Sequence, residues 1–135
     1  MIRILSGEEL SRLWVQCVPY VEKSLAHGMG DITPYDIFIE CLQSTSQCWV
    51  QEDDGKIIGV AITRILHHKQ YKELVIVCTT CKDWLKVGPA VLEEIEEFAK
   101  GYGCKYTSVY GRRGWLRRLE KFGYKQPYTL LMKEI

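Results

Sequence analysis

The chain has 135 residues, 47% of them hydrophobic, which is enough apolar surface for the core of one globular domain over residues 1–135. Its 18 Lys and Arg residues against 17 Asp and Glu residues leave a net charge of +1. This balance excludes a strong overall field that would draw the protein to nucleic acid or to a membrane surface, so a charged binding site must be local.

The first residues and the cysteines indicate the compartment. The apolar run of residues 1–5 is too short for a signal peptide or a membrane span, which predicts a cytoplasmic protein. The cysteines lie mostly within apolar helix or strand patterns, as small core residues of a reducing compartment do. We therefore expect reduced thiols at Cys17, Cys41, Cys48, Cys78, Cys81 and Cys104.

The first half of the chain predicts two helices. Ser6 followed by Glu9 fits a capping box, and apolar residues then recur at helical spacing until about Gly28. Thr33-Pro34 fits an N-cap followed by proline at the first helical position. This second, shorter helix runs to about Gln43.

Strands are predicted in the middle of the chain. Asp53-Asp54-Gly55 separates two apolar runs, 48–52 and 56–67, which is the pattern of an antiparallel hairpin. The run 71–80 is too continuously apolar for a strand that faces water on one side, so it predicts a central strand.

A long helix is predicted next, with Gly88-Pro89-Ala90 opening an amphipathic pattern that ends at Gly101. A helix that starts just after a buried strand points its free N–H groups and positive dipole end beyond the sheet, which makes a place for phosphate. The remaining pattern predicts a strand over 106–110, a short basic helix over 115–122 and a closing strand over 128–133. This order predicts an α+β domain with a mixed, mostly antiparallel sheet flanked by helices.

The order of elements, the segment 87–100 and the motif Leu119-Glu120-Lys121-Phe122-Gly123-Tyr124 together resemble the GCN5-related N-acetyltransferase (GNAT) family over nearly the whole chain. Within that family the chain is most similar to short GNAT-like proteins of bacteriophages, in which a Gly-Arg-x-Gly-Trp segment follows the fifth strand. The corresponding segment here is Gly111-Arg112-Arg113-Gly114-Trp115. The resemblance implies direct transfer of an acetyl group from acetyl-CoA to an amine.

The resemblance also implies that acetyl-CoA lies in a cleft where the fourth and fifth strands part. The groups implied for its binding are strand backbone for pantetheine at Cys78, Thr79 and Thr80, and amides for the pyrophosphate at Val87, Gly88 and Ala90. Lys86, Arg112 and Arg113 can add phosphate contacts, because guanidinium forks suit pyrophosphate oxygens. The alternative for these three is a solvated turn.

Several positions depart from the family pattern. The phosphate loop usually reads Gln/Arg-x-x-Gly-x-Gly/Ala, but its first position here is Leu85, and Pro89 has no N–H to offer. Leu119 stands where the family often has the tyrosine that protonates the leaving thiolate. Tyr110 and Gly111 lie near the position of a common asparagine.

The catalytic groups are therefore left open. Tyr110 and Tyr124 are the phenols that can act as general acid, and Glu73 or a water held by backbone can act as base. The alternative for the tyrosines is an amphipathic edge of the core with a hydrogen-bonded hydroxyl. Cys78 and Cys81 have the spacing of a metal site, but residues three apart on a strand point to opposite faces, so no metal is expected.

Two hypotheses follow. The first is an N-acetyltransferase of the GNAT type that uses acetyl-CoA and an unknown small-molecule or protein amine. The second is a GNAT-fold protein that has lost catalysis and serves a phage as an accessory, virion-associated or host-interaction protein, in the host cytoplasm or on the virion. The departures favour the second, whereas Gly88 and the long helix favour retained cofactor binding. Nucleic-acid binding through the basic segment 112–121 ranks last, and no membrane partner is expected.

Overall fold

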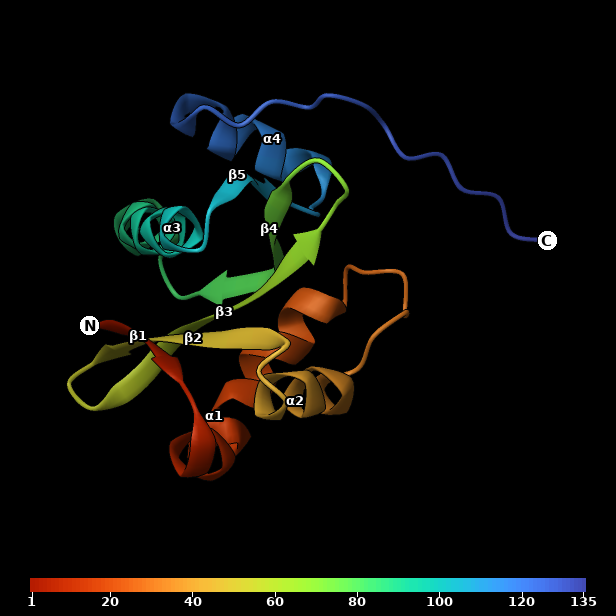
Figure 1. Ribbon diagram of the computed structural model, residues 1–135. Helices are drawn as coiled ribbons and strands as arrows, with labels where there is room; N and C mark the ends of the chain where they lie inside the picture. Colours follow the sequence, from red (N-terminus) through yellow and green to blue (C-terminus); the bar gives the residue numbers. More distant parts are fainter.

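Five strands form one sheet, in the spatial order β1-β2-β3-β4-β5, in the computed structural model, which describes residues 1–135 (Figure 1). The strands are β1 (Ile2–Leu5), β2 (Ser46–Asp53), β3 (Lys56–His67), β4 (Lys72–Cys81) and β5 (Cys104–Val109). β4 and β5 run parallel, whereas the other neighbouring strands are antiparallel. The predicted α+β domain with a mixed, mostly antiparallel sheet is confirmed.

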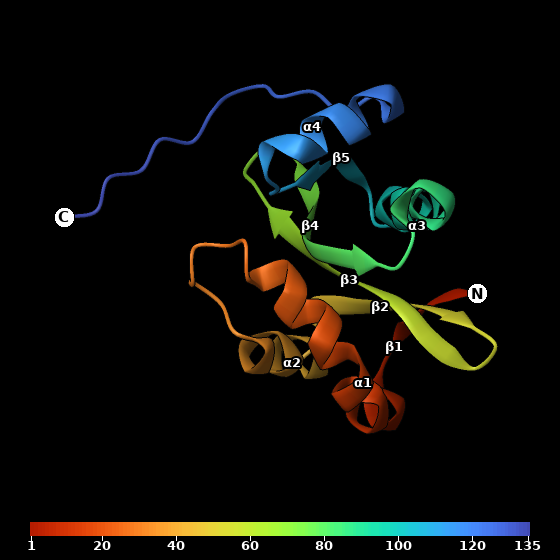
Figure 2. The same ribbon diagram turned by 180° about the vertical axis from the view of Figure 1, so that it is seen from behind.

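Helices cover both faces of this sheet, with α1 and α2 on one face and α3 and α4 on the other (Figures 1 and 2). The helices are α1 (Gly7–Leu25), α2 (Pro34–Leu42), α3 (Trp84–Gly101) and α4 (Arg113–Leu119), and a short 3-10 turn (Glu120–Phe122) follows α4. None of them combines the length and the apolar character that crossing a bilayer requires.

Each face of the sheet carries its own apolar core, because successive residues of a strand point to opposite sides. Cys48 and Val50 of β2 pack against α1 and α2, whereas Trp49 between them packs against α3. The Trp49 indole N–H donates to Thr63 Oγ1 at 2.9 Å, so the polar atom of this buried ring is satisfied.

The hairpin and the second helix form as predicted. Asp54 and Gly55 have φ angles of 53° and 77°, which is the left-handed backbone that the two central residues of a type I′ turn need. The Thr33 hydroxyl accepts from the Asp36 N–H, and the Asp36 carboxylate accepts from the Thr33 N–H, so the N-cap of α2 is confirmed.

The start of the chain differs from the prediction in two ways. Residues 2–5 form β1, which pairs with β2 from Ile2 opposite Gln51 onward, whereas no strand was predicted there. The predicted capping box of α1 is wrong: Ser6 makes no capping hydrogen bond, and the Glu9 carboxylate instead pairs with Arg3 of β1. A charged partner on a neighbouring strand binds this carboxylate more strongly than a neutral amide of its own helix.

Two later predictions are also corrected. The third helix begins at Trp84 rather than at Gly88, so Pro89 lies inside α3. The closing strand over 128–133 is absent, because residues 124–135 have no regular structure and β5 has no neighbour on its outer edge. A strand needs a second strand to satisfy its backbone groups, and the local sequence of residues 128–133 does not supply one.

Candidate functional site

β4 and β5 part halfway along β4. β5 pairs with β4 from Lys72 to Ile76, and the later residues of β4 pair only with β3 on their other side. Ile76 lies opposite Thr63 and Cys78 lies opposite Ile62, so Val77 between them forms a bulge. The edge of β4 that would face β5 therefore has backbone N–H and C=O groups with no strand partner beyond Ile76.

Cys78, Thr79 and Thr80, which the family resemblance assigns to pantetheine, all lie on this part of β4. The Cys78 side chain is buried in the core beneath α1 and α2, and burial raises the pKa of its thiol to about 12. Thr79 points to the opposite face, towards α3. Cys81 also lies on the α3 side, so the two cysteines do not converge on one point.

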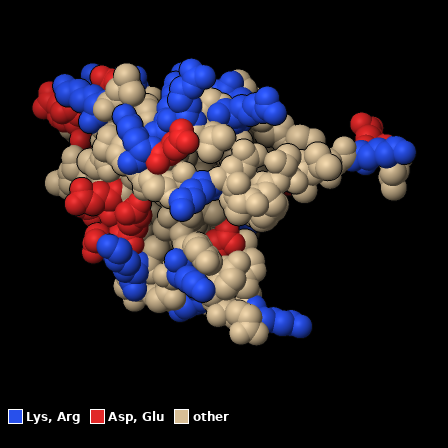
Figure 3. Space-filling model, turned by 90° about the horizontal axis from the view of Figure 1, so that it is seen from above, with Lys and Arg blue, Asp and Glu red and all other residues tan.

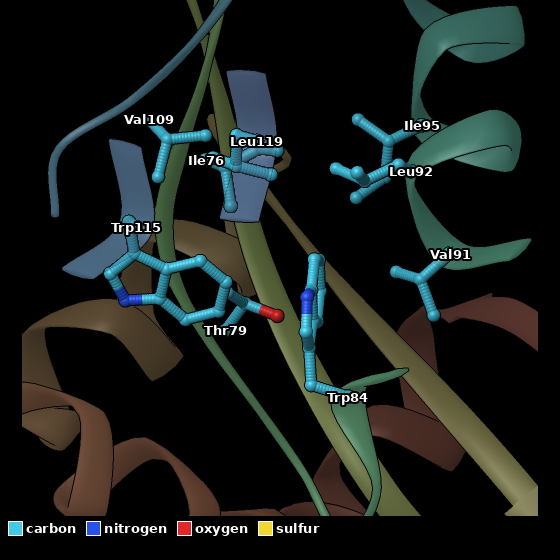
Figure 4. A pocket seen from close by; sticks show the side chains of 9 residues that line it. All are labelled: Ile76, Thr79, Trp84, Val91, Leu92, Ile95, Val109, Trp115 and Leu119. Atoms are coloured by element: carbon cyan, nitrogen blue, oxygen red, sulfur yellow. The ribbon is translucent and has the colours of Figure 1, made fainter. Parts of the chain in front are cut away.

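The space beside this edge, on the α3 side, is filled by two indoles (Figure 4). Trp84 stands at the start of α3 and Trp115 comes from α4, and their rings meet edge to face with centroids 4.9 Å apart. The cavity left around them measures about 10 Å³, which is about the space of one water molecule. Its walls are Ile76, Thr79, Trp84, Val91, Leu92, Ile95, Val109, Trp115 and Leu119.

Two glycines make room for these indoles. A Cβ at Gly88 would lie 2.3 Å from Cε3 of Trp84, and a Cβ at Gly111 would lie 2.8 Å from Cδ1 of Trp115. No side chain other than hydrogen fits either contact. The close approach that the sequence suggests for a phosphate at Gly88 is thus made here by an indole of the protein itself.

The predicted amides lie within α3. The Val87 N–H donates to the Asp83 carbonyl at 2.9 Å, as it must when the helix begins at Trp84. Gly88 and Ala90 follow on the same helix, and Pro89 between them has no N–H. The free amides of α3 are therefore those of its first turn, before Val87, and an anion at Val87 and Gly88 requires that turn to open.

Basic residues lie next to the indoles in the chain and, for Arg118, in space. Lys86 in α3 and Arg112 and Arg113 at the start of α4 are exposed, and none of them forms a salt bridge. The Arg118 guanidinium lies 5.3 Å from the centre of the Trp115 ring. Figure 3 looks onto the α4 side of the molecule and shows several Lys and Arg side chains gathered there. A local gathering of positive charge of this kind favours the approach of an anion.

The candidate catalytic residues do not all lie on the same face of the sheet. Glu73 of β4 accepts a hydrogen bond from the Ser108 hydroxyl of β5, and its Oε1 lies 2.6 Å from His68 Nε2. Tyr110 follows β5, and the pKa of its phenol is raised by partial burial and by the negative charge of Glu73. Tyr124 lies on the α3 and α4 side, where its hydroxyl is 3.0 Å from Thr107 Oγ1.

Glu73 and Tyr110 are near enough for the charge of Glu73 to act on the phenol, whereas Tyr124 packs on the α3 and α4 side. Burial, partly offset by the Thr107 hydrogen bond, raises the pKa of Tyr124 as well. Sequence reasoning missed the ion pair between Arg64 and Glu40, 2.6 Å long, on the same face as Glu73. An arginine in the mostly apolar strand β3 is the signal that could have found it.

The amino-acid sequence matches no protein-family model and no curated protein sequence. The structure does match solved structures. One is a ribosomal-protein-alanine N-acetyltransferase from Brucella melitensis biovar Abortus 2308, with a TM-score of 0.76 and 10% identity over 100% of this chain and 99% of that chain. A second is an aminoglycoside acetyltransferase from an uncultured soil metagenomic sample, in complex with sisomicin. It has a TM-score of 0.75 and 12% identity over 100% of this chain and 95% of that chain.

A third is a GNAT family acetyltransferase from Staphylococcus aureus, with a TM-score of 0.69 and 15% identity over 100% of this chain and 98% of that chain. Identities this low speak for the arrangement of helices and strands and not for a shared substrate. The agreement spans nearly the full length of both chains in each case. The chain therefore has the fold of the GNAT acetyltransferases.

Proposed function

We propose that this protein binds acetyl-CoA along the free edge of β4 and transfers the acetyl group to an amine. The single observation that carries the proposal is the unpaired edge of β4 after Ile76, beside the bulge at Val77, in a chain with the GNAT fold. Free N–H and C=O groups can pair with an extended, amide-containing chain such as pantetheine. Lys86, Arg112 and Arg113 supply positive charge for its phosphates.

The proposed chemistry uses Glu73 and Tyr110. The amine nitrogen attacks the thioester carbonyl, so that a C–N bond forms and the C–S bond breaks. The Glu73 carboxylate, held by Ser108 and His68, takes the proton of the amine directly or through a water. Tyr110 gives its proton to the leaving thiolate; like an ordinary tyrosine its phenol is protonated at neutral pH, and partial burial and the negative charge of Glu73 raise its pKa further.

The indole pair must open before acetyl-CoA can bind in this way. Trp84 fills the space beside Thr79, and Gly88 behind it is bare backbone. If Trp84 swings out, Gly88 becomes the surface that a phosphate can approach closely. Because the closed arrangement competes with the ligand, the apparent affinity is reduced by the fraction of molecules that are closed.

The same indole pair favours a second candidate function. A GNAT-fold protein that no longer needs its cofactor can fill the cleft with its own side chains, and the residual cavity of about 10 Å³ fits that description. In this case the protein is a bacteriophage accessory, virion-associated or host-interaction protein, as its similarity to phage GNAT-like proteins suggests. In the first case it works in the cytoplasm of the bacterial host.

Thermal unfolding with increasing acetyl-CoA separates the two functions. Under the first, the melting temperature rises with ligand concentration, because the ligand binds only the folded state. Trp84→Ala binds acetyl-CoA more tightly than the wild type, because no indole has to be displaced. Trp14→Ala is the matched control, because this indole packs on Phe38 on the opposite face of the sheet, with ring centroids 5.3 Å apart. Its loss lowers the stability of the fold without changing the affinity for acetyl-CoA.

If neither the wild type nor Trp84→Ala is stabilised by millimolar acetyl-CoA, the enzyme proposal is refuted and the second function is favoured. If binding is found, release of free CoA is measured with amines of different kinds, including aminoglycosides and peptides with a free N-terminus. Glu73→Gln then lowers kcat by about 10²–10⁴ with unchanged acetyl-CoA affinity. Glu97→Gln, an exposed carboxylate of α3 paired only with Lys100, leaves kcat unchanged.

A further inference from the structure

Gln51 of β2 has a buried side-chain oxygen that no donor satisfies. The residue is 8% exposed, and its Oε1 lies away from solvent without a hydrogen-bond partner. Nearly all buried acceptors of folded proteins are paired, because an unpaired one forfeits the hydrogen bond that it made to water in the unfolded chain. The unpaired oxygen of Gln51 therefore indicates that a donor reaches it in another state of the protein.

The Gln51 side chain reaches across β3 towards β4. A Cβ at Gly59 of β3 would lie 3.1 Å from Gln51 Oε1 and 2.8 Å from the Cβ of Cys81, so only glycine leaves this path open. The oxygen lies beside a cavity of about 10 Å³ that also has Thr80 and Trp84 in its walls. The polar end of Gln51 thus shares a cavity with the indole that fills the cleft.

The Trp84 indole borders two cavities. One is the space beside the free edge of β4 that it shares with Trp115 (Figure 4), and the other is the cavity of Gln51. The Trp49 indole N–H donates to Thr63, whereas the Trp84 N–H donates to no protein atom. An indole donor without an acceptor and a buried acceptor without a donor therefore lie on one cavity.

We propose that Trp84 has a second position, in which its ring leaves Trp115 and its N–H donates to Gln51 Oε1, and that this position opens the cleft to acetyl-CoA. The inference rests on the proposed function, because it says where the indole goes when acetyl-CoA enters. Gln51 is then a positioning residue, which acts through Trp84 and contacts no substrate. Only the N–H edge of the ring has to enter the cavity of Gln51, which has room for about one water molecule.

Each position of Trp84 gives up one interaction to make another. In the closed position the ring meets Trp115 edge to face, with centroids 4.9 Å apart, and Gln51 Oε1 stays unpaired. In the second position the hydrogen bond is made and the ring contact is lost. An aromatic pair and a buried hydrogen bond are of similar strength, so a ligand that needs the cleft can shift the population from one position to the other.

Proton NMR of the indole N–H groups tests the second position without any ligand. The four tryptophans give one signal each, and the signal of Trp84 is the one missing in Trp84→Phe. Trp115→Ala removes the partner of the closed position, so we expect the Trp84 signal to move downfield and its exchange with water to slow roughly tenfold. Adding Gln51→Met reverses both changes.

Gly111→Ala gives a second route to the same measurement if Trp115→Ala does not fold. A Cβ at Gly111 would lie 2.8 Å from Cδ1 of Trp115, so the ring is displaced from Trp84 without being deleted. The Trp84 N–H is expected to slow in exchange here as well, and Gln51→Met again reverses the effect.

Acetyl-CoA binding tests what the second position does. Gln51→Met weakens acetyl-CoA binding about three- to tenfold, because the open position loses its hydrogen bond, while the fold is no less stable. In Trp84→Ala there is no indole to hold, so Gln51→Met leaves the affinity unchanged. Gln47→Met is the matched control on the same strand: it loses the buried hydrogen bond from Thr63 and lowers stability, but leaves acetyl-CoA affinity unchanged.

This inference and the proposed function fail in different ways. If Trp84→Ala and the wild type do not bind acetyl-CoA, the proposed function is refuted, and the NMR experiment still decides where the indole goes. A Trp84 N–H that stays in fast exchange in Trp115→Ala and Gly111→Ala, or that Gln51→Met does not release, overturns the second position. So does an affinity for acetyl-CoA that Gln51→Met leaves unchanged, or weakens equally with and without the Trp84 indole.

Discussion

Gly88→Ala is the substitution that best tests how the cleft is filled. A Cβ at position 88 lies 2.3 Å from Cε3 and 2.4 Å from Cδ2 of Trp84, closer than non-bonded carbons approach. The indole must move, and in doing so it leaves its edge-to-face contact with Trp115. Overpacking of this kind costs about 1–3 kcal/mol, whereas alanine gains up to about 1 kcal/mol over glycine in a helix. We expect a net loss of about 1 kcal/mol.

Gly101→Ala is the control in the same helix, because a Cβ there meets nothing within 4 Å. We expect this change to raise the free energy of unfolding by a few tenths to about 1 kcal/mol. Urea unfolding followed by circular dichroism measures both variants. A double-mutant cycle of Gly88→Ala with Trp84→Ala isolates the contact, because without the indole the new methyl group is free of strain. The expected coupling is about 1 kcal/mol or more.

Equal stabilisation at Gly88 and Gly101, with no coupling to Trp84, would refute the close contact between Gly88 and the Trp84 indole. Tryptophan fluorescence reports whether the space beside β4 opens. Gly88→Ala is expected to push the indole out of the space beside β4, and a change in tryptophan fluorescence that is absent in Gly101→Ala reports that movement.

Two further predictions concern buried polar groups. Gln51 Oε1 is buried without a hydrogen-bond partner, so Gln51→Met leaves the free energy of unfolding unchanged or raises it by up to about 1 kcal/mol in urea titrations. Gln47→Met lowers it by about 1–2 kcal/mol, because Gln47 accepts from the buried Thr63 hydroxyl at 2.7 Å; equal effects at both glutamines would contradict this difference. Burial raises the pKa of Cys41 and of Cys78 to about 12 from an ordinary 9.0. The unfolded thiols therefore ionise first, stability falls as pH rises from 9 to 12, and Cys78→Ala makes that fall shallower in unfolding curves measured against pH.

Local patterns predicted most of the elements, because the information for them lies within a few residues. Asp54-Gly55 supplied the left-handed turn of the hairpin, and the Thr33 cap with Pro34 marked the start of α2. The start of α3 was misplaced because Pro89 is typical of the first turn of a helix, yet here packing of Trp84 extends the helix backward. β1 was not predicted, because its four residues are too few to show the pattern of a strand.

The sequence by itself determined the order of the elements from α1 to α4, the helices that flank the sheet and the resemblance that pointed to the fold. Only the tertiary structure decided what lies beside the free edge of β4. Trp84 and Trp115 come from different helices, and no local pattern reports that they meet. Side-chain periodicity is a property of neighbours in the chain, whereas a cleft is filled or left open by residues that only packing brings together.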